Sequence, residues 1–477
     1  MRSPFERQDK IMAGNPERTP TSAIEGAVDA IRLILGDRIS TAQAVREQHG
    51  CTVTWHENQP PDAVTFPNTT EEVSEIVKIC ARFRVPVIPF GTGTALEGHV
   101  NAPHGGVCVS TRQLNEIIEV NASDFDATVG AGVTRLALNS YIRDLGLFFP
   151  IDPGADASLG GMTSTRASGT NAVRYGTMKD NVLSVKVVKA DGSIIRTSTR
   201  ARKSSAGYDL TRLFVGAEGT LGVITEITLR LHPVPESILS AVCPFPSVAE
   251  ACETAIAAVQ SGIPIARVEL LDDVQMRACN RYSKLELPEV TTLFLEFHGT
   301  EASAREQAKT FEEIASDLGG GPFQWATAPE ERNRLWKARH ESYSAQLNLR
   351  PGAKTFATDV CVPISRLAEC VVATKEDVIR SGLICCILGH VGDGNFHAAP
   401  LVMMDDKQEV AQARAFADRI VLRALECGGT CTGEHGIGQD KRKYMVREHG
   451  DDTVETMRQI KQALDPLNIM NPGKLLP

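Results

Sequence analysis

Hydrophobic and polar positions between residues 50 and 236 switch between the spacing of helices and the spacing of strands. Thr69 and Glu72 form a capping box, and apolar residues follow them at helical spacing, which predicts a helix. The next apolar run, Val85–Phe90, is rich in β-branched residues and proline, and predicts a strand that enters a glycine-rich turn. A further helix is expected from Thr134 to Gly146. The pattern indicates a domain of mixed helices and strands.

A predicted hairpin and one more strand complete this region. Asp191-Gly192 separates the runs Val182–Lys189 and Ser193–Thr197, which is a strong signal for a β-hairpin. Val223–Leu231 alternates like a half-buried strand, and prolines follow at 233 and 235. These prolines predict a domain boundary near residue 236.

Beyond residue 238 the predicted helices become longer. Helices are expected over residues 247–262, 301–318, 329–347 and 364–381, and strands over 291–298, 383–390 and 396–402. Several strands in succession beside long helices favour an α+β fold built on an antiparallel sheet. The chain is accordingly divided into a polar N-terminal tail with a helical lead-in (1–50), two domains (51–236 and 237–450) and a C-terminal segment (451–477).

Composition narrows the class of protein. The 477 residues carry 59 acidic and 50 basic side chains, and a net charge of -9 gives no overall attraction for nucleic acid. The longest apolar run falls far short of the ~20 residues of a transmembrane helix, so none is expected. The 12 cysteines include no Cys-x-x-Cys pair, which argues against zinc-finger and iron–sulfur sites. Residues 1–25 lack the apolar core of an export signal, so we expect reduced thiols and a cytoplasmic location, with peripheral contact to the inner membrane left open.

Three glycine-rich segments carry the first candidate chemistry, at residues 89–98, 153–169 and 216–222. Glycines such as Gly91 and Gly93 let the backbone approach a diphosphate closely, and successive N–H groups can hold an anion. Each segment alone could be a tight turn. The second has little apolar content, and a long segment without regular structure in a compact domain is usually functional. Together the three favour a site for a large dinucleotide.

A nicotinamide site of the Rossmann type is the competing interpretation. Thr128–Gly132 runs from a predicted strand toward a helix, but the third small residue that this motif requires falls on Arg135. An arginine there would prevent the close packing of helix on strand. The sequence therefore argues against a Rossmann site.

The order and spacing of the three loops resemble the flavin-binding half of the vanillyl-alcohol-oxidase/p-cresol-methylhydroxylase superfamily. Five further segments resemble D-lactate dehydrogenases of the cytochrome type, namely residues 336–340, 358–363, 389–397, 429–438 and 471–474. The resemblance implies an FAD-binding domain of two α+β subdomains (51–236), an α+β cap with an antiparallel sheet that holds substrate and metal (237–450), and a tail (451–477) that returns to the flavin domain. It also implies an FAD-dependent D-2-hydroxy-acid dehydrogenase.

The resemblance further implies how FAD is held. Relatives that bind flavin covalently through the first loop carry histidine directly after its glycine pair, where this chain has Thr94. Non-covalent FAD is therefore expected, with His99 as an alternative point of attachment. The expected cofactor contacts are Pro89, Phe90, Gly91, Thr92, Gly93, Thr94, Pro153, Ser158, Gly160, Gly161, Thr165, Ser168, Gly222, Ile224 and Asn471.

Two histidines and one glutamate in glycine-rich segments form a candidate metal site. His390 and His397 flank a turn that can bring both imidazoles to one point, and Glu434 adds a carboxylate. This ligand set leaves coordination positions open, as a catalytic metal requires. The alternative is that the histidines only form hydrogen bonds in a buried turn. Oxygen ligation by a hydroxy acid favours Zn²⁺ or Mn²⁺, although non-haem Fe(II) uses the same ligands.

Oxidation of a 2-hydroxy acid would use each of these groups. The metal would lower the pKa of the substrate hydroxyl, and His435 is the candidate general base for its proton. Arg339 is the candidate clamp for the substrate carboxylate, with an ordinary surface arginine as the alternative. Hydride would pass to the flavin. Because no cysteine cluster is present to carry electrons onward, we expect an external acceptor, which could be a cytochrome, a quinone or an electron-transfer flavoprotein.

One departure from the relatives bears on the substrate. Those that act on 2-hydroxyglutarate carry asparagine two residues after the second metal histidine, where this chain has Ala399. The missing amide argues against a second substrate carboxylate, although Lys354 lies near the relatives' second basic position. D-lactate is therefore the expected substrate and pyruvate the product. The alternatives are a D-2-hydroxyglutarate or glycolate dehydrogenase, or a flavin subunit that needs an iron–sulfur partner.

Overall fold

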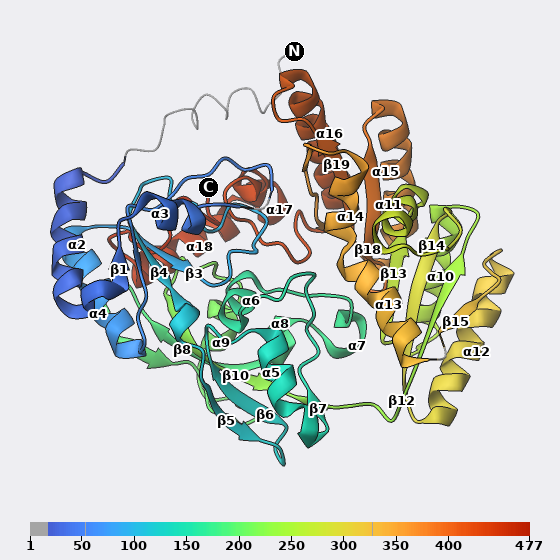
Figure 1. Ribbon diagram of the computed structural model, residues 1–477, viewed down its shortest axis with the longest axis horizontal. Helices are drawn as coiled ribbons and strands as arrows, with labels where there is room; N and C mark the ends of the chain where they lie inside the picture. Colours follow the sequence, from blue (N-terminus) through green and yellow to red (C-terminus); the bar gives the residue numbers. More distant parts are fainter. Residues whose placement is uncertain (1–17, 53, 327) are drawn as a thin grey trace.

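The computed structural model describes residues 18–52, 54–326 and 328–477, and arranges them in two lobes (Figure 1). Most of the expected polar tail lies outside the described residues. The first lobe contains the three glycine-rich segments, and the second contains the predicted metal ligands. The mixed helix and sheet composition confirms the predicted α+β class. The domain limits at residues 50, 236 and 450 stay predictions.

The first lobe begins with a four-stranded sheet. Its strands lie in the order β1 (Ile39–Ser40), β2 (Ala63–Thr65), β4 (Val107–Ser110) and β3 (Val87–Phe90), and the last three are parallel. Helices α2 (Thr21–Leu35) and α4 (Thr70–Phe83) share a buried core with these strands, and the short α3 (Gln43–His49) lies nearby. The capping box predicted at the start of α4 is present in part, since the Thr69 hydroxyl accepts the Glu72 N–H at 3.2 Å.

A second, antiparallel sheet completes this lobe. Its strands lie in the order β5 (Ile117–Asn121), β6 (Asp126–Gly130), β10 (Val223–Arg230), β8 (Val182–Val188) and β9 (Ile194–Arg196). The predicted hairpin is confirmed, because β8 and β9 pair directly across Asp191-Gly192. The associated helices are α5 (Arg135–Ile142), α6 (Leu159–Thr165), α7 (Ala172–Tyr175), α8 (Met178–Asn181) and α9 (Leu210–Phe214), and β7 (Leu147–Phe148) pairs with β11 (His232–Pro233).

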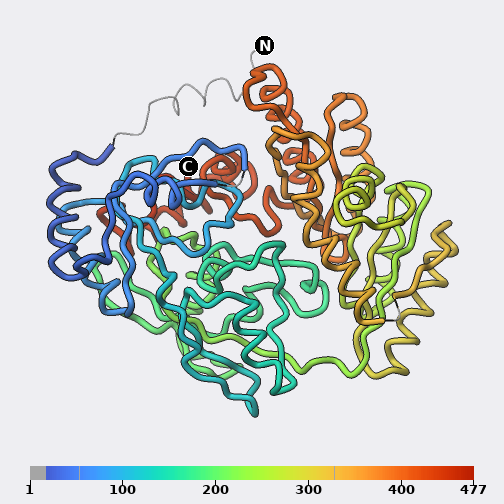
Figure 2. The backbone as a smooth tube through the Cα atoms, viewed as in Figure 1, coloured from blue at the N-terminus to red at the C-terminus, as the bar shows by residue number. Residues whose placement is uncertain are grey.

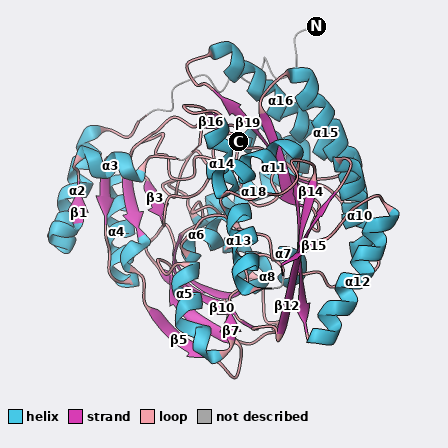
Figure 3. Ribbon diagram, turned by 45° about the vertical axis from the view of Figure 1, so that its right-hand side comes forward, coloured by secondary structure: helices cyan, strands magenta, loops and turns pink. Residues whose placement is uncertain are grey.

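The second lobe is built on one large antiparallel sheet. Its strands lie in the order β15 (Gln324–Ala326), β12 (Ser237–Pro244), β14 (Thr292–Gly299), β13 (Arg267–Leu271), β18 (Cys385–His390), β19 (Asn395–Val402) and β16 (Lys354–Thr355), and β17 (Val360–Cys361) also pairs with β19. One face shares its buried core with α10 (Val248–Gln260), α12 (Glu301–Asp317), α15 (Leu367–Ser381) and α16 (Lys407–Glu426) (Figure 3). The other face packs with α11 (Asp273–Ser283), α13 (Pro329–His340) and α14 (Ser342–Leu349).

Two expectations about local structure were wrong. The segment 153–169 was expected to lack regular structure, but α6 forms within it because the Ser158 side chain caps the helix and Leu159 and Met162 are buried. The single helix expected over residues 329–347 is divided into α13 and α14, since Glu341 leaves helical geometry between them.

The chain crosses between the lobes and then comes back. It enters the second lobe through the strand after Pro233 and returns beyond α16 through a long loop (Figure 2). Helices α17 (Met445–His449) and α18 (Asp451–Leu464) then lead to a tail that pairs in parallel with β3, where Met470 bridges to Val87. This return places the loop that carries Glu434 and His435 beside the glycine-rich loops.

Candidate functional site

A cavity of about 480 Å³ lies where the two lobes meet. Its walls contain residues from all three glycine-rich segments, together with residues of the α13–α14 region and with Glu434 and His435. The predicted cofactor contacts that line it are Pro89, Phe90, Gly91, Thr92, Gly93, Thr94, Pro153, Gly160, Gly161, Thr165, Ser168, Ile224 and Asn471. Ser158 and Gly222 do not line it.

The first glycine loop leaves β3 and presents bare backbone to this cavity. Gly93 has a φ of +73°, a left-handed conformation that residues with a side chain rarely adopt. A Cβ on Gly91 would collide with the Ser158 hydroxyl, which caps α6 by accepting the Gly161 N–H at 3.4 Å. The loop and α6 can therefore approach each other closely because position 91 has no side chain.

The predicted metal ligands come together next to this wall. His390 ends β18 and His397 lies in β19, and the pairing of these strands puts both side chains on one face of the sheet. Glu434 Oε1 lies 3.0 Å from His390 Nε2 and 3.4 Å from His397 Nε2. One candidate ligand atom from each of the three residues lies within 4.8 Å of the other two, a spacing that can hold one cation.

The remaining imidazole nitrogens of these two histidines face acceptors. His390 Nδ1 lies 2.7 Å from Glu269 Oε1, and His397 Nδ1 lies 3.2 Å from the Thr358 carbonyl oxygen. A histidine that donates from Nδ1 keeps the Nε2 lone pair for a metal. Both rings therefore present a ligand nitrogen toward Glu434.

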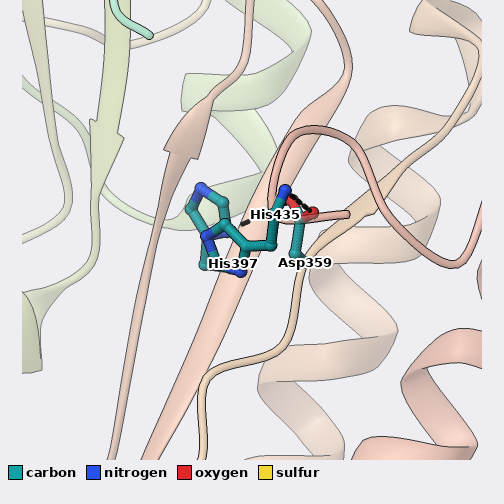
Figure 4. Close-up of side chains that lie close together, drawn as sticks. All are labelled: Asp359, His397 and His435. Carbon is teal, nitrogen blue, oxygen red and sulfur yellow. Dashed lines mark hydrogen bonds and ion pairs between the residues drawn. The ribbon is translucent and has the colours of Figure 1, made fainter. Parts of the chain in front are cut away.

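Asp359 fastens the loop that carries Glu434 and His435. Its carboxylate accepts four hydrogen bonds of 2.7–2.9 Å, from the Thr432 hydroxyl, the Asn395 amide and the backbone N–H groups of Glu434 and His435. Asp359 also lies close enough to His397 and His435 to form a second possible ligand group (Figure 4). Because its oxygens are already occupied by four donors, we assign Asp359 to the loop and not to an ion.

His435 lies between the candidate metal site and the buried carboxylate of Glu97. Its ring stacks on that of His397 with centroids 4.9 Å apart, and its Nδ1 lies 3.6 Å from Glu97 Oε1. Lys441 Nζ lies 2.9 Å from the same oxygen. Burial acts to raise the pKa of Glu97, but Lys441 and His435 outweigh it and lower the value to about 2. Glu97 is thus a permanent negative charge behind the candidate base.

Arg339 is buried on α13 and does not line the cavity. Its guanidinium pairs with Glu269 Oε2 at 2.6 Å, so it is not the surface arginine considered above. Its Nε has no hydrogen-bond partner among the residues that the structure describes.

Two family models match the chain. "FAD linked oxidases, C-terminal domain" covers residues 234–475, and "FAD binding domain" covers residues 61–198. The chain is 54% identical over 460 residues to a Danio rerio protein named probable D-lactate dehydrogenase, mitochondrial, with 96% of this chain and 93% of that protein covered. It is 45% identical to the mitochondrial D-lactate dehydrogenase [cytochrome] of Arabidopsis thaliana, with 98% and 82% covered.

The chain belongs to the FAD-linked oxidases. The expected fold is confirmed by p-cresol methylhydroxylase, which is 20% identical and superposes with a TM-score of 0.81 over 96% of this chain and 97% of that chain. The glycine-lined wall of this FAD-linked oxidase suits the cofactor, because its bare backbone allows a diphosphate to approach where side chains would exclude it.

Electrostatics at the histidine–glutamate cluster favour a cation. Burial alone would lower the pKa of His390, but Glu269 and Glu434 outweigh it and raise the value well above normal. Burial would raise the pKa of Glu434, yet His390 and His397 lower it, so the carboxylate stays ionised. Two imidazole nitrogens and one ionised carboxylate match the donor set of a catalytic divalent metal.

The sequence analysis did not identify three residues that contact the candidate site in this FAD-linked oxidase: Glu97, Glu269 and Asp359. All three are buried carboxylates in contact with predicted site residues. Glu269 carries a usable signal, since it is the one charged residue inside the apolar run Val268–Leu271. Glu97 and Asp359 contact residues that are distant in sequence, so no local pattern points to them.

No helix in the described part of this FAD-linked oxidase is long and apolar enough to span a membrane. All twelve cysteines are free thiols, and most are buried.

Proposed function

We propose that this FAD-linked oxidase oxidises D-lactate to pyruvate, with FAD as hydride acceptor and a divalent metal, Zn²⁺ or Mn²⁺, as Lewis acid. The observation that carries the proposal is that the glycine-rich loops, Glu434 and His435 line the same cavity. A substrate held at the histidine–glutamate cluster would therefore lie against the flavin. The names of the relatives supply the substrate class.

The three glycine-rich segments would hold FAD through backbone N–H groups. Thr94 follows Gly93 directly and offers no nucleophilic nitrogen, which supports non-covalent binding. FAD supplies the redox chemistry when bound, because its ring accepts a hydride. His99 is buried beside Glu218, with its Nε2 3.2 Å from that carboxylate, so this neighbour competes with any role in flavin attachment.

His390, His397 and Glu434 would hold the metal and leave positions for the hydroxyl and carboxylate oxygens of the substrate. The metal supplies Lewis acidity, which lowers the pKa of the hydroxyl. His435 is the proposed general base for the hydroxyl proton. Its Nδ1 faces Glu97, so Nε2 is the nitrogen left to accept that proton.

Arg339 remains the proposed clamp for the substrate carboxylate. Its guanidinium is held by Glu269 on one side, and its unpartnered Nε can donate to a bound carboxylate. Arg339 itself does not line the cavity, but the next two residues, His340 and Glu341, do, so it lies directly behind the cavity wall.

A single substrate carboxylate fits the remaining contacts. Ala399 lies two residues beyond His397 in β19, on the same face of the sheet, and contributes no polar group there. Lys354 is exposed in β16 and donates to the Thr54 carbonyl oxygen at 3.2 Å, outside the cavity lining. These contacts favour lactate over D-2-hydroxyglutarate.

Electrons would leave the reduced flavin for a separate acceptor, a cytochrome, a quinone or an electron-transfer flavoprotein. The free thiols are dispersed through the chain and support a reducing compartment. The cytoplasmic location and peripheral contact with the inner membrane stay predictions, and the two relatives described above are named as mitochondrial.

The test is dye reduction by the purified protein with D-lactate, L-lactate, glycolate and D-2-hydroxyglutarate. We expect a yellow protein that is most active with D-lactate, whose flavin enters the supernatant after acid precipitation. Chelation should abolish turnover, and Mn²⁺ or Zn²⁺ should restore it. Equal turnover of D-2-hydroxyglutarate would reassign the substrate, and full activity after complete metal removal would overturn the metal's role. A yellow protein inactive with all four acids would favour a flavin subunit.

A further inference from the structure

Glu269 is a fully buried carboxylate at the centre of the large sheet, on β13. The register of the sheet places it directly opposite His390 on β18. Residues directly opposite in antiparallel strands project from the same face, so the two side chains meet. The neighbours Val268 and Leu270 point into the apolar core on the other face. A buried charge in such a strand requires compensation.

The two oxygens of Glu269 face different parts of the proposed site, one through a hydrogen bond and the other through an ion pair. Oε1 lies 2.7 Å from Nδ1 of His390. Oε2 lies 2.6 Å from the guanidinium of Arg339 on α13. One carboxylate therefore connects a proposed metal ligand with the proposed clamp for the substrate carboxylate.

We propose that Glu269 is a positioning residue that couples metal binding to substrate binding. The inference rests on the proposed function of His390 and Arg339. Glu269 accepts the Nδ1–H of His390 and so holds the ring in the tautomer that presents Nε2 to the metal. The same carboxylate holds the Arg339 guanidinium behind the cavity wall.

An amide cannot replace this carboxylate. His390 hydrogen-bonds to Glu269 and Arg339 forms an ion pair with it, and a carboxylate offers a negatively charged oxygen to each of them. Glutamine offers one acceptor and one amino group, so it must turn a donor toward either His390 or Arg339. The ring of His390 or the guanidinium of Arg339 then loses its support. Outer carboxylates of this kind are typically worth about 10–100-fold in metal affinity.

The test is Glu269→Gln in the FAD-loaded full chain, with Mn²⁺ as the probe. Free Mn²⁺ is measured by electron paramagnetic resonance in the absence of substrate, which gives a dissociation constant without reference to activity. We expect the Mn²⁺ affinity to fall about 10–100-fold and the KM for D-lactate to rise, with the flavin spectrum unchanged. Glu269→Asp keeps the charge but shortens the reach, and a smaller loss of Mn²⁺ affinity is expected.

Glu296 provides a matched control. It is buried on the adjacent strand β14 and likewise contacts one histidine and one arginine, with His298 at 2.7 Å and Arg267 at 3.5 Å. Within the described part of the chain, its hydrogen bonds and ion pairs go to residues other than the proposed metal ligands, so Glu296→Gln should leave the Mn²⁺ affinity within about threefold of the wild type.

The outcomes separate the inference from the function on which it rests. Wild-type protein that binds Mn²⁺ while Glu269→Gln binds it within threefold would overturn the coupling role. Equal losses in Glu269→Gln and Glu296→Gln would also overturn it, since any buried charge would then have the same effect. Wild-type protein without a specific Mn²⁺ or Zn²⁺ site would refute the proposed metal function itself. If Glu269→Gln does not fold, the Mn²⁺ affinity of Glu269→Asp tests the proposal instead. An affinity equal to that of the wild type would then overturn it.

Discussion

Replacing Asp359 with asparagine should displace the loop that carries Glu434 and His435. The carboxylate is fully buried, and three of its four hydrogen bonds go to this loop, namely to the Thr432 hydroxyl and to two backbone N–H groups. Burial would raise the pKa of Asp359, but His435 and Lys441 hold it well below normal, so the loop is fastened to a charged acceptor.

The size of the expected effect on the loop follows from the number of hydrogen bonds that Asp359 accepts from it. Hydrogen bonds to a charged group are worth about 1.5–3 kcal/mol each and neutral ones about 0.5–1.5 kcal/mol. Converting the three bonds from the loop to neutral ones therefore costs about 3 kcal/mol, or roughly 100-fold in the equilibrium between the ordered and the displaced loop. The new amino group would also face the Asn395 amide, which donates to Asp359 at 2.8 Å.

The assay compares D-lactate turnover, bound metal and flavin absorbance in Asp359→Asn. We expect turnover and metal affinity to fall by roughly 100-fold while FAD is retained, because the glycine-rich loops belong to the other lobe. Asp377→Asn is the matched control, since Asp377 on α15 is also buried in the second lobe but binds Arg419 of α16 at 2.9 Å. Turnover within threefold of wild type in Asp359→Asn would refute the reasoning.

Three further outcomes test the flavin wall, the ligands and the tail. Gly91→Val should yield protein with little FAD, because the valine side chain would collide with Ser158. The FAD content is measured as the ratio of flavin absorbance to protein absorbance, and a full content would contradict the prediction. His397→Ala should abolish turnover and lower the amount of bound metal, with the flavin spectrum unchanged. His435→Gln should keep the metal and lower kcat by roughly 10²–10⁴. Loss of metal in both variants would show that His435 is not distinct from the metal ligands. Burial lowers the pKa of Lys474 from 10.5 to about 7 in the folded protein. Between pH 7 and pH 10.5 the unfolded chain therefore binds more protons than the folded chain, and the stability of the wild type rises with pH in this range. The Tm of Lys474→Met relative to wild type should therefore fall from pH 7 to pH 10, and a difference independent of pH would show that burial does not lower the pKa of the Lys474 amino group.

Local patterns of residues predicted many elements well. The helix after Thr69, the strand Val87–Phe90 and the hairpin at Asp191-Gly192 all depend on neighbours in sequence, through capping, β-branching and turn geometry. The loop at 153–169 was predicted less well, because its composition is polar and small while the burial that stabilises α6 comes from strands far along the chain. Glu341, where the expected long helix divides, gave no local signal such as proline or glycine.

The sequence by itself determined the class of protein, the glycine-rich backbone of the flavin wall and the identity of the candidate ligands, because residue type and spacing limit the available chemistry. The tertiary structure decided which charges act together. Glu269 meets His390 through strand register, Glu97 meets His435 across 338 residues, and Asp359 fastens a loop 75 residues away. These contacts form between elements that no local period relates, and each buried carboxylate acquires its role only from the donors that folding brings to it.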